Sequence, residues 1–409
     1  MALVVMKFGG SSVATPDRIK HVASRVSKKV SEGHRVVVVV SAMGDTTNRL
    51  IALSGQISPK PDLRSYDLLL STGEMVSIAL LAMALSDLGV SAVPMTAYQL
   101  GIQTDSNHKQ ARVKVVKPQH ILRVLQEGQV VVAAGFQGVS EDYHITTLGR
   151  GAGDKTAVIL AAILKADLCE IYTDVEGVFT ADPRIVPEAR KLRSISCDEM
   201  LELATSGAKV MNSDSIEWAK KYNVPLVVRS TFSESEGSMI QNFSAMDDPV
   251  VVGAAASSKD ARISVHGIKA AGGGVGRIFR AVSDAKVNVD MIVLTPTGNG
   301  FELSFTVPRE SLDSALSVVK GLQNELGASS IDADSSVAKV SIVGVGMQNH
   351  RGVAARMFEA LAKKGIQPSA VTTSEIKVSV LVPEARMQES VKALHDEFEL
   401  SRDPQAIPS

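Results

Sequence analysis

Over the first 230 residues, short apolar runs alternate with longer amphipathic segments and with loops rich in small residues. Residues 3–8, 35–40 and 129–134 are apolar runs rich in valine or alanine, and each ends at a loop that contains glycine. Residues 16–32 and 68–88 have the spacing and length of helices. Apolar runs of strand length suit strands that are buried on both faces of a parallel sheet. We therefore expect an α/β domain with a mainly parallel open sheet sandwiched by helices.

One loop stands out because three glycines fall within five residues. It reads Gly149-Arg-Gly-Ala-Gly-Asp154 and runs directly into the apolar segment 157–164. Such a loop lets the backbone approach a ligand closely, and a helix that begins near Asp154 would point free N–H groups and its positive dipole end at a phosphate. The alternative is a tight turn in which Asp154 simply caps the helix. Ligands of open α/β sheets bind beyond the carboxyl ends of the strands, and the small-residue loops of this chain follow strands.

Beyond a linker at residues 233–249, the C-terminal part contains an internal repeat. Arg262-Ile-Ser-Val-His-Gly-Ile-Lys is echoed by Lys339-Val-Ser-Ile-Val-Gly-Val-Gly, and Arg277-Ile-Phe-Arg-Ala-Val is echoed by Arg356-Met-Phe-Glu-Ala-Leu. Each copy predicts a βαββαβ-like unit, which is typical of small α+β sandwiches. We expect a first domain over residues 1–245 and two repeat domains over residues 250–328 and 329–409. The alternative role for the repeats is dimerisation alone.

Composition narrows the class of partner. The chain has 409 residues, 21% of them charged and 45% hydrophobic, with a formal net charge of -1. It is too long for one ordinary core, and its charge offers no field for nucleic acid or an acidic membrane. We find no apolar run of the roughly 20 residues that cross a bilayer, and Lys7 interrupts the N-terminal apolar segment, so we expect neither a membrane span nor an export signal. Cys169 and Cys197 are the only cysteines, which fits a reducing, cytoplasmic location.

The charged residues in or near the small-residue loops indicate phosphoryl transfer. Neither GxxxxGK[ST] nor the protein-kinase catalytic loop occurs, and no His/Cys cluster has metal-ligand spacing. Separate glycine-rich loops occur together with Lys7, Arg150, Arg184 and Lys209. Phosphoryl transfer needs mainly positioning and charge neutralisation, which backbone N–H groups, lysines and Mg²⁺ can supply.

Segments along nearly the whole chain, in order, resemble the aspartate kinases of the amino-acid kinase superfamily. The matching segments are Lys7-Phe-Gly-Gly-Ser-Ser-Val, Val39-Val-Ser-Ala-Met-Gly-Asp-Thr-Thr, Ser71-Thr-Gly-Glu, Gly135-Phe-Gln-Gly, Thr146-Thr-Leu-Gly-Arg-Gly, Tyr172-Thr-Asp-Val-Glu-Gly-Val and Thr180-Ala-Asp-Pro-Arg. The repeat is similar to their pair of ACT regulatory domains. The resemblance implies transfer of the ATP γ-phosphoryl group, with Mg²⁺, to the side-chain carboxylate of L-aspartate, the first step towards lysine, threonine and methionine. A carboxylate is already ionised at neutral pH, so no general base is needed.

The resemblance also implies roles for individual residues. Lys7 and Asp154 would act at the transferring phosphoryl group, Glu74 would meet the substrate ammonium, and Arg150 would clamp a carboxylate through a bidentate fork. The remaining substrate positions are Thr46, Thr47, Gly151 and Gly153. The nucleotide positions, besides Lys7, are Phe8, Gly9, Gly10, Ser11, Ser41, Thr173, Asp174, Asp182, Pro183, Arg184 and Lys209. The effector positions are Met291, Ile292, Leu294, Thr373, Ser374 and Glu375.

No metal ligand is expected from the protein. For Lys155 and Asp214 we expect solvated charges. Taken singly, the others have plain structural alternatives: Lys7 as an edge lysine, Glu74 as an exposed helix charge, and 182–184 as a turn with a salt bridge.

This chain departs from the family pattern at several places. The family's loop usually reads GRGGSDTTA, so that Gly153 replaces a serine that would touch the substrate. Met211-Asn-Ser-Asp214 replaces the usual Leu-His-Pro-Arg. In the repeats, Gly272-Gly-Gly274 replaces a proline-glycine turn, Leu294-Thr295 replaces Gln-Asn, and Gln367-Pro-Ser-Ala-Val371 replaces a branched-apolar and Gln-Met run. Lost polar contacts at an effector site remove the differential affinity on which inhibition depends, so we expect weakened or altered feedback by lysine or threonine.

Three interpretations follow. The first is an aspartate kinase that forms a homo-oligomer through its ACT-like domains. The second is a kinase for an aspartate-like acid, motivated by Gly153. The third is a catalytically silent ACT-containing regulatory subunit. Retention of Lys7, Glu74, Arg150 and Asp154 argues against the third, because a silent domain has no reason to keep these charges.

Overall fold

The structure is a computed structural model that describes residues 1–149, 151–208, 210–243, 249–269, 273–298 and 300–403. The chain divides into two compact units. The first comprises residues 1–178, 191–204 and 209–245, and the second comprises residues 179–190, 205–208 and 246–409.

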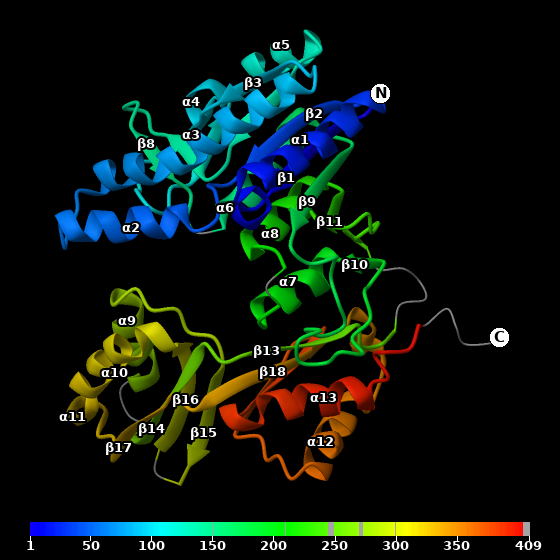
Figure 1. Ribbon diagram of the computed structural model, residues 1–409. Helices are drawn as coiled ribbons and strands as arrows, with labels where there is room; N and C mark the ends of the chain where they lie inside the picture. The colour runs from blue at the N-terminus through cyan, green and yellow to red at the C-terminus, as the bar shows by residue number, and fades with distance from the viewer. Residues whose placement is uncertain (150, 209, 244–248, 270–272, 299, 404–409) are drawn as a thin grey trace. The chain divides into compact units, whose positions relative to one another are not determined.

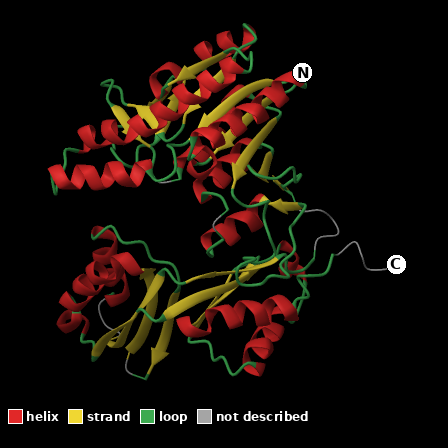
Figure 2. Cartoon of the chain, viewed as in Figure 1, coloured by secondary structure: helices red, strands yellow, loops and turns green. Residues whose placement is uncertain are grey.

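An eight-stranded sheet forms the centre of the first unit (Figures 1 and 2). All neighbouring strands are parallel except β11 and β12, as the valine-rich runs predict. Val37 to Val40 of β2 are fully buried, as expected for a strand covered on both faces. Across the sheet the strands are β10 (Ser194–Ser196), β12 (Ser238–Gln241), β11 (Leu226–Ser230), β9 (Leu168–Thr173), β1 (Leu3–Phe8), β2 (Arg35–Val40), β6 (Val130–Ala134) and β3 (Ala92–Met95).

Helices cover the sheet in two layers, which confirms the predicted α/β fold. Apolar residues of α1 and α3 pack with β1, β2 and β6 in one buried cluster, while α6 contacts β1, β2 and β9 and packs against α8. The helices are α1 (Pro16–Ser31), α2 (Thr46–Ile57), α3 (Leu63–Asp87), α4 (Ala97–Leu100), α5 (Gln119–Gln126), α6 (Ala152–Leu164), α7 (Cys197–Thr205) and α8 (Ser213–Tyr222), with a 3-10 turn η1 (Gly10–Val13).

Helix starts follow the capping chemistry of the sequence, with one correction. The Thr15 Oγ1 accepts a hydrogen bond from the Arg18 N–H at 3.3 Å and Pro16 opens α1, as an N-cap followed by proline predicts. Helix α6 begins at Ala152, so that Asp154 lies in its first turn and is not its cap. The Asp154 carboxylate is therefore available for a partner outside the helix.

A second, four-stranded sheet flanks the first and was not expected from the sequence. Its strands, in order, are β5 (Val113–Val116), β4 (Ile102–Thr104), β7 (Gln137–Val139) and β8 (Ile145–Thr147). Strands of three or four residues are too short for an alternating pattern to be read. The Thr104 and Thr146 hydroxyls, 2.6 Å apart and fully buried, join β4 to β8.

Helix α3 is long enough, and one 18-residue stretch of it with a mean hydropathy of 1.9 is apolar enough, to cross a membrane by length and composition. Its packing identifies it as a core helix. Leu81 and Leu85 are fully buried under the sheet, and the same helix buries the carboxylates of Asp67 and Glu74 inside the protein. Buried carboxylates with protein partners are a feature of globular cores.

The second unit contains two antiparallel four-stranded sheets (Figure 1). The first is β15 (Ile292–Thr297), β16 (Gly300–Pro308), β14 (Asp260–Lys269) and β17 (Ser330–Asp334), with α9 (Gly274–Asp284), α10 (Leu312–Gly321) and α11 (Gln323–Leu326). The second is β13 (Gly253–Ser257), β18 (Val337–Val343), β20 (Lys377–Pro383) and β19 (Ala370–Thr373), with α12 (Val353–Lys363) and α13 (Met387–Glu397). Short 3-10 turns lie at η2 (Arg309–Ser311), η3 (Val345–Asn349) and η4 (Glu384–Arg386).

Each sheet carries one copy of the sequence repeat, but the last strand of the second copy comes from elsewhere. Strand β13 precedes the first copy in sequence and pairs antiparallel with β18 of the second copy. The first copy closes with its own strand β17, which pairs with β14. The second sheet is thereby completed by a segment that enters before the first repeat begins.

The assignment of α3 as a core helix predicts opposite outcomes for two of its residues. Leu81→Ala removes a fully buried side chain and should lower the free energy of unfolding of the first unit by about 2–5 kcal/mol. Met83→Ala, on the same helix but 63% exposed, should change it by less than about 0.5 kcal/mol. Calorimetry of the full chain measures both, and equal effects would contradict the assignment.

Candidate active site

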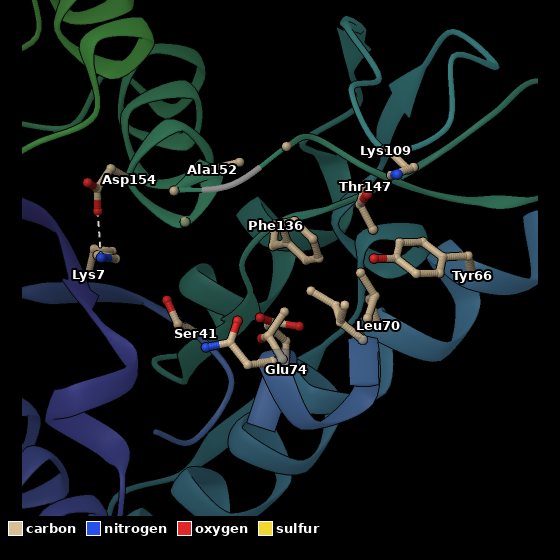
Figure 3. Close-up of a pocket in the computed structure, with 16 residues that line it drawn as sticks. Lys7, Ser41, Tyr66, Leu70, Glu74, Lys109, Phe136, Thr147, Ala152 and Asp154 are labelled. Carbon is tan, nitrogen blue, oxygen red and sulfur yellow. Dashed lines mark ion pairs between the residues drawn. The ribbon is translucent and has the colours of Figure 1, made fainter. Parts of the chain in front are cut away.

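A pocket of about 480 Å³ opens in the first unit where the ends of β1 and β2 meet α3, α6 and the loop 105–112 (Figure 3). This is the carboxyl edge of the central strands, where the fold places ligands. Its lining residues are Lys7, Ser41, Thr47, Asn48, Ile51, Tyr66, Leu70, Glu74, Lys109, Phe136, Thr147, Gly149, Gly151, Ala152, Gly153 and Asp154.

An ion pair between Lys7 and Asp154 forms one end of the pocket. The Lys7 Nζ lies 2.5 Å from the Asp154 Oδ1, and both side chains are nearly buried, with 12% and 11% of their surface exposed. Lys7 comes from the end of β1 and Asp154 from the first turn of α6. The pair thus joins the central strand to the helix that follows the glycine-rich loop, and the ammonium lies beside the free N–H groups of a helix start. Such a position favours an anion.

Two glycines at this end permit close packing that a side chain would block. A Cβ at Gly153 would lie 3.0 Å from the Ser41 Oγ and 3.2 Å from the Lys7 Cε. A Cβ at Gly10 would lie 2.9 Å from the Ala42 carbonyl oxygen. The loops after β1 and β2 and the start of α6 therefore approach one another more closely than side chains would allow.

Glu74 presents a carboxylate oxygen with unmet hydrogen-bonding capacity to the pocket. Its side chain is on the buried face of α3, and its Oε1 accepts a hydrogen bond from the Ala42 N–H at 3.0 Å. Its Oε2 is buried and has no hydrogen-bond partner among the described residues. Burial raises the pKa of Glu74 from 4.5 to about 7, although the bond from Ala42 opposes the rise. A buried polar atom without a partner is costly, and a ligand ammonium group is the partner that suits it.

Several residues singled out from the sequence line this pocket. They are Lys7, Ser41, Thr47, Glu74, Gly151, Gly153 and Asp154. Thr46 lies beside Thr47 at the start of α2, and its hydroxyl donates a hydrogen bond to the Met43 carbonyl at 2.6 Å. Arg150 and Lys209 lie outside the described residues.

The remaining nucleotide positions are distributed more widely. Gly9, Gly10 and Ser11 follow β1, but the Phe8 side chain is fully buried and stacks on Tyr172 with ring centroids 4.6 Å apart, so that only its backbone could face a nucleotide. Thr173 ends β9, and its hydroxyl donates to the Asp174 Oδ1 at 3.0 Å.

Asp182, Pro183 and Arg184 belong to the second unit. The Arg184 Nη2 lies 2.6 Å from the Asp182 Oδ2. This segment therefore contains the turn with a salt bridge that we expected as the alternative to a nucleotide site. The nucleotide role of the three residues stays a prediction.

The effector positions lie on two strands of the second unit that adjoin each other. Ile292 and Leu294 are on β15, and Thr373 ends β19, which contacts β15. Ser374 and Glu375 follow directly, and the Glu375 Oε2 accepts a hydrogen bond from Gln348 at 3.0 Å. Met291 is buried, whereas Ile292 and Leu294 are 50% and 44% exposed. These two exposed positions on β15 are apolar, whereas Thr373, Ser374 and Glu375 are exposed and polar.

Sequence reasoning missed part of the pocket wall and misjudged one pair. Tyr66, Lys109 and Phe136 line the pocket, but an isolated lysine in a polar loop and two aromatic residues carry no motif. Lys155 and Asp214, which we expected to be solvated, form an ion pair with 3.2 Å between the Lys155 Nζ and the Asp214 Oδ2. The Lys155 side chain is only 13% exposed, so that expectation was wrong for it.

Comparison with known proteins agrees with this geometry. Residues 2–230 match the amino acid kinase family, and residues 340–398 match an ACT domain. The chain is 49% identical over 403 residues to an aspartate kinase of Stutzerimonas stutzeri, with 98% of each chain covered. It is 46% identical over 408 residues to aspartokinase 2 of Bacillus subtilis, with 100% of each chain covered. The chain belongs to the aspartate kinase family.

Solved structures of the family share its architecture. An aspartate kinase from Synechocystis is 39% identical with a TM-score of 0.56, and the match covers 100% of this chain and 71% of that one. E. coli aspartokinase III in complex with aspartate and ADP is 24% identical with a TM-score of 0.81, and the match covers 97% and 99%. At 24% identity, the similarity to aspartokinase III supports a shared fold only.

The raised pKa of Glu74 predicts a pH-dependent affinity for an aspartate kinase substrate. Only the ionised carboxylate attracts an ammonium group, and with a pKa of about 7 the ionised fraction rises about tenfold between pH 6 and pH 8. The KM for L-aspartate should therefore fall by up to about tenfold over this range, while the KM for ATP changes less than twofold. Initial rates in a single mixed buffer measure both, and an aspartate KM that is flat with pH would contradict the assignment.

The same carboxylate predicts a gain of stability when its charge is removed. The folded protein ionises Glu74 near pH 7, whereas the unfolded chain does so near 4.5, so the native state holds the extra proton and loses stability as pH rises through this window. Glu74→Gln should raise the Tm at pH 8 and leave it nearly unchanged at pH 5, where the wild-type side chain is neutral. Calorimetry at the two pH values checks this. An equal shift at both would point to packing and not to charge.

Proposed function

We propose that this chain transfers the γ-phosphoryl group of ATP to the side-chain carboxylate of L-aspartate and so forms 4-phospho-L-aspartate and ADP. The proposal rests on one observation: a site that suits a phosphoryl group and a site that suits an ammonium group lie in the same pocket. A buried Lys7–Asp154 pair lies at one end, and a buried Glu74 oxygen with no hydrogen-bond partner among the described residues lies on the wall. The first suits a phosphoryl group, and the second suits the ammonium of an amino acid. The aspartate kinases that this chain matches along its full length support the acceptor.

In the proposed reaction the aspartate side-chain carboxylate is the nucleophile. One of its oxygens forms a bond to the γ-phosphorus, the bond from that phosphorus to the bridging oxygen breaks, and ADP leaves with the electron pair. Lys7 neutralises charge that develops on the transferring group. Glu74 holds the substrate ammonium. The α-carboxylate of the substrate does not react and requires a cation as its partner. Asp154 keeps Lys7 in place at 2.5 Å.

The residues present fit a polyphosphate. Gly10, in the 3-10 turn after β1, and Gly153, in the first turn of α6, let these segments pack closely beside Lys7, and a helix start has backbone N–H groups free for an anion. No group of three or more potential metal ligands occurs among the described residues. This agrees with Mg²⁺, which keeps several waters and is bound by one or two carboxylates together with substrate phosphates. When bound, Mg²⁺ would supply charge neutralisation on the phosphate oxygens.

We place the enzyme in the cytoplasm and infer that its ACT-like unit binds an amino-acid effector and forms the homo-oligomer contact. The apolar, exposed side chains of Ile292 and Leu294 on β15 offer little hydrogen bonding to a polar effector. Lysine or threonine should therefore bind weakly, and feedback inhibition should be weakened or altered.

One assay separates the proposed function from its alternatives. Incubation with Mg-ATP, hydroxylamine and a set of acids should give an acyl hydroxamate with L-aspartate. A signal only with another acid would favour a kinase for an aspartate-like substrate. No signal with any acid would favour a catalytically silent regulatory subunit.

Removal of the Lys7 ammonium should abolish turnover without unfolding the protein. Lys7→Ala takes away the charge beside the phosphoryl group and should lower kcat by about 10²-fold or more. Lys28→Ala, on the exposed surface of α1, serves as the matched control and should leave kcat within twofold. The hydroxamate assay measures both variants, and circular dichroism reports the fold. A folded Lys7→Ala enzyme with normal kcat would refute the role of Lys7.

The effector hypothesis is tested by titrating lysine and threonine, singly and together, against the purified enzyme. We expect little inhibition below about 1 mM, because the two exposed effector positions on β15, Ile292 and Leu294, are apolar. Strong inhibition at sub-millimolar effector would discard the hypothesis.

A further inference from the structure

One buried threonine bridges the ends of neighbouring strands at the carboxyl edge of the large sheet. Strands β11, β9 and β1 lie next to one another in that order and run parallel (Figure 1). Thr231 directly follows β11 and is fully buried. Its N–H donates a hydrogen bond to the Thr173 carbonyl, at the end of β9, at 2.8 Å. Its hydroxyl lies 2.6 Å from the hydroxyl of Ser12, in the 3-10 turn after β1. Thr231 therefore connects the end of β9 to the turn after β1.

All three polar groups of Thr231 have a partner. Besides the bonds of its N–H and hydroxyl, its carbonyl oxygen lies 2.8 Å from the Nε2 of His21 on α1. The Ser12 hydroxyl is as fully buried as that of Thr231. Because a buried hydroxyl that loses its partner lowers stability, each of the two side chains holds the other in place. The pair thus fixes the turn after β1 to the segment that follows β11.

The carbonyl oxygens of the same turn are also hydrogen-bonded. The Gly10 carbonyl accepts a hydrogen bond from the Gly44 N–H at 3.0 Å. The Ser11 carbonyl accepts one from the Arg18 Nη1 at 2.5 Å. A rotation of either peptide plane would break one of these bonds, so that the N–H groups of the turn keep their directions. The Ser12 side chain adds the contact that anchors the turn in the buried interior.

This turn lies beside the ammonium group of Lys7. A Cβ at Gly9 would lie 3.5 Å from the Lys7 Nζ, and Lys7 forms the end of the pocket that suits a phosphoryl group. Thr173 ends the strand beside β1, at the same carboxyl edge, where this kind of sheet binds its ligands. Thr231 itself has no exposed surface with which to touch a ligand. Its influence on a ligand therefore passes through the two segments that it joins.

We propose that Thr231 is a positioning residue for the nucleotide, which acts by holding the turn after β1 and the end of β9 at a fixed separation. The inference rests on the proposed function, which places the phosphates of ATP beside Lys7. A turn that is ordered before the nucleotide arrives does not have to be ordered by the binding energy, so the affinity is higher. The effect is selective, because the ammonium of L-aspartate is held by Glu74 of α3, which Thr231 does not position.

Thr231→Val removes the hydroxyl and keeps the branched shape of the side chain. The KM for ATP should rise about tenfold, the factor that corresponds to the loss of one buried hydrogen bond, while the KM for L-aspartate changes less than twofold. Thr231→Ser keeps a hydroxyl and should return the KM for ATP to within threefold of the wild-type value. Initial rates in the hydroxamate assay measure both constants. An unchanged KM for ATP, or equal rises in the two KM values, would overturn the proposal.

The same hydrogen bond is removed from its other side by Ser12→Ala, which keeps the proposal testable if Thr231→Val does not fold. This variant should raise the KM for ATP to a similar extent, and the double variant should add less than twofold to either single change. Ser341→Ala is the matched control, because it removes an equally buried hydroxyl 2.7 Å from that of Ser379 in the second unit. It should leave both KM values within twofold. Full additivity of the Ser12 and Thr231 effects would show that the two hydroxyls act independently and would overturn the proposal.

Failure of the proposed function is distinguishable from failure of this inference. If wild-type enzyme forms no hydroxamate from aspartate, the function is wrong, and calorimetric titration of Mg-ADP into the wild-type, Thr231→Val and Thr231→Ser proteins then tests the positioning role alone. The wild-type protein should bind Mg-ADP about tenfold more tightly than Thr231→Val, and Thr231→Ser should resemble the wild type. Equal affinities of the wild-type and Thr231→Val proteins, or no binding of Mg-ADP to the wild type, would overturn the proposal.

Discussion

The ion pair between Lys7 and Asp154 is the contact on which the arrangement of the first unit depends. It joins the end of the central strand β1 to the first turn of α6, two segments almost 150 residues apart in sequence. An ion pair with so little exposure costs desolvation, which good geometry and neighbouring dipoles must offset. The helix start beside it contributes in two opposite ways, since its positive end favours the carboxylate and disfavours the ammonium. An anionic ligand bound beside the Lys7 ammonium would therefore offset this unfavourable interaction with the helix dipole.

Three buried carboxylates line or flank the same cavity, and each is stabilised differently. Asp154 is paired with a lysine, and Asp67 accepts hydrogen bonds from the Lys109 N–H and from the N–H and hydroxyl of Thr147 on β8. Glu74 has one oxygen bonded to the Ala42 N–H and one for which the described residues supply no hydrogen-bond donor. The first two carboxylates hold parts of the pocket in place, whereas the third keeps one oxygen that no donor of the described residues meets. A buried oxygen without a hydrogen-bond donor lowers the stability of the folded protein, and such a group is retained where a bound ligand supplies the donor.

The sequence was sufficient to predict the larger elements of the fold. It also predicted the end of the pocket that contains Lys7 and the glycine-rich loop, because those residues form recognisable motifs. Valine-rich runs predicted β2 and β6, capping residues predicted the start of α1, and the glycine-rich loop predicted a helix start close to Asp154. The small sheet β4, β5, β7 and β8 could not be predicted, because strands of three or four residues have no measurable period. The place of Lys109 in the pocket wall could not be predicted either. It depends on a hydrogen bond from the Lys109 N–H to Asp67, 42 residues away, and contacts so distant in sequence leave no local pattern.

The position of one short segment shows why domain boundaries drawn from sequence order and from packing need not coincide. Residues 179–190 lie between strands of the first unit in sequence, yet they belong to the second unit. Ala181 and Val186 pack into the apolar core formed by β18, β20, α12 and α13, and the Thr180 hydroxyl lies 3.0 Å from the Nε2 of the buried His395 on α13. The Thr180 carbonyl also accepts a hydrogen bond from Ala254 on β13. Asp182 to Arg184, to which the family resemblance gives a nucleotide role, are thus held by the packing of an ACT-like core. Any repacking of that core would move them, because close-packed interiors transmit displacement and do not absorb it.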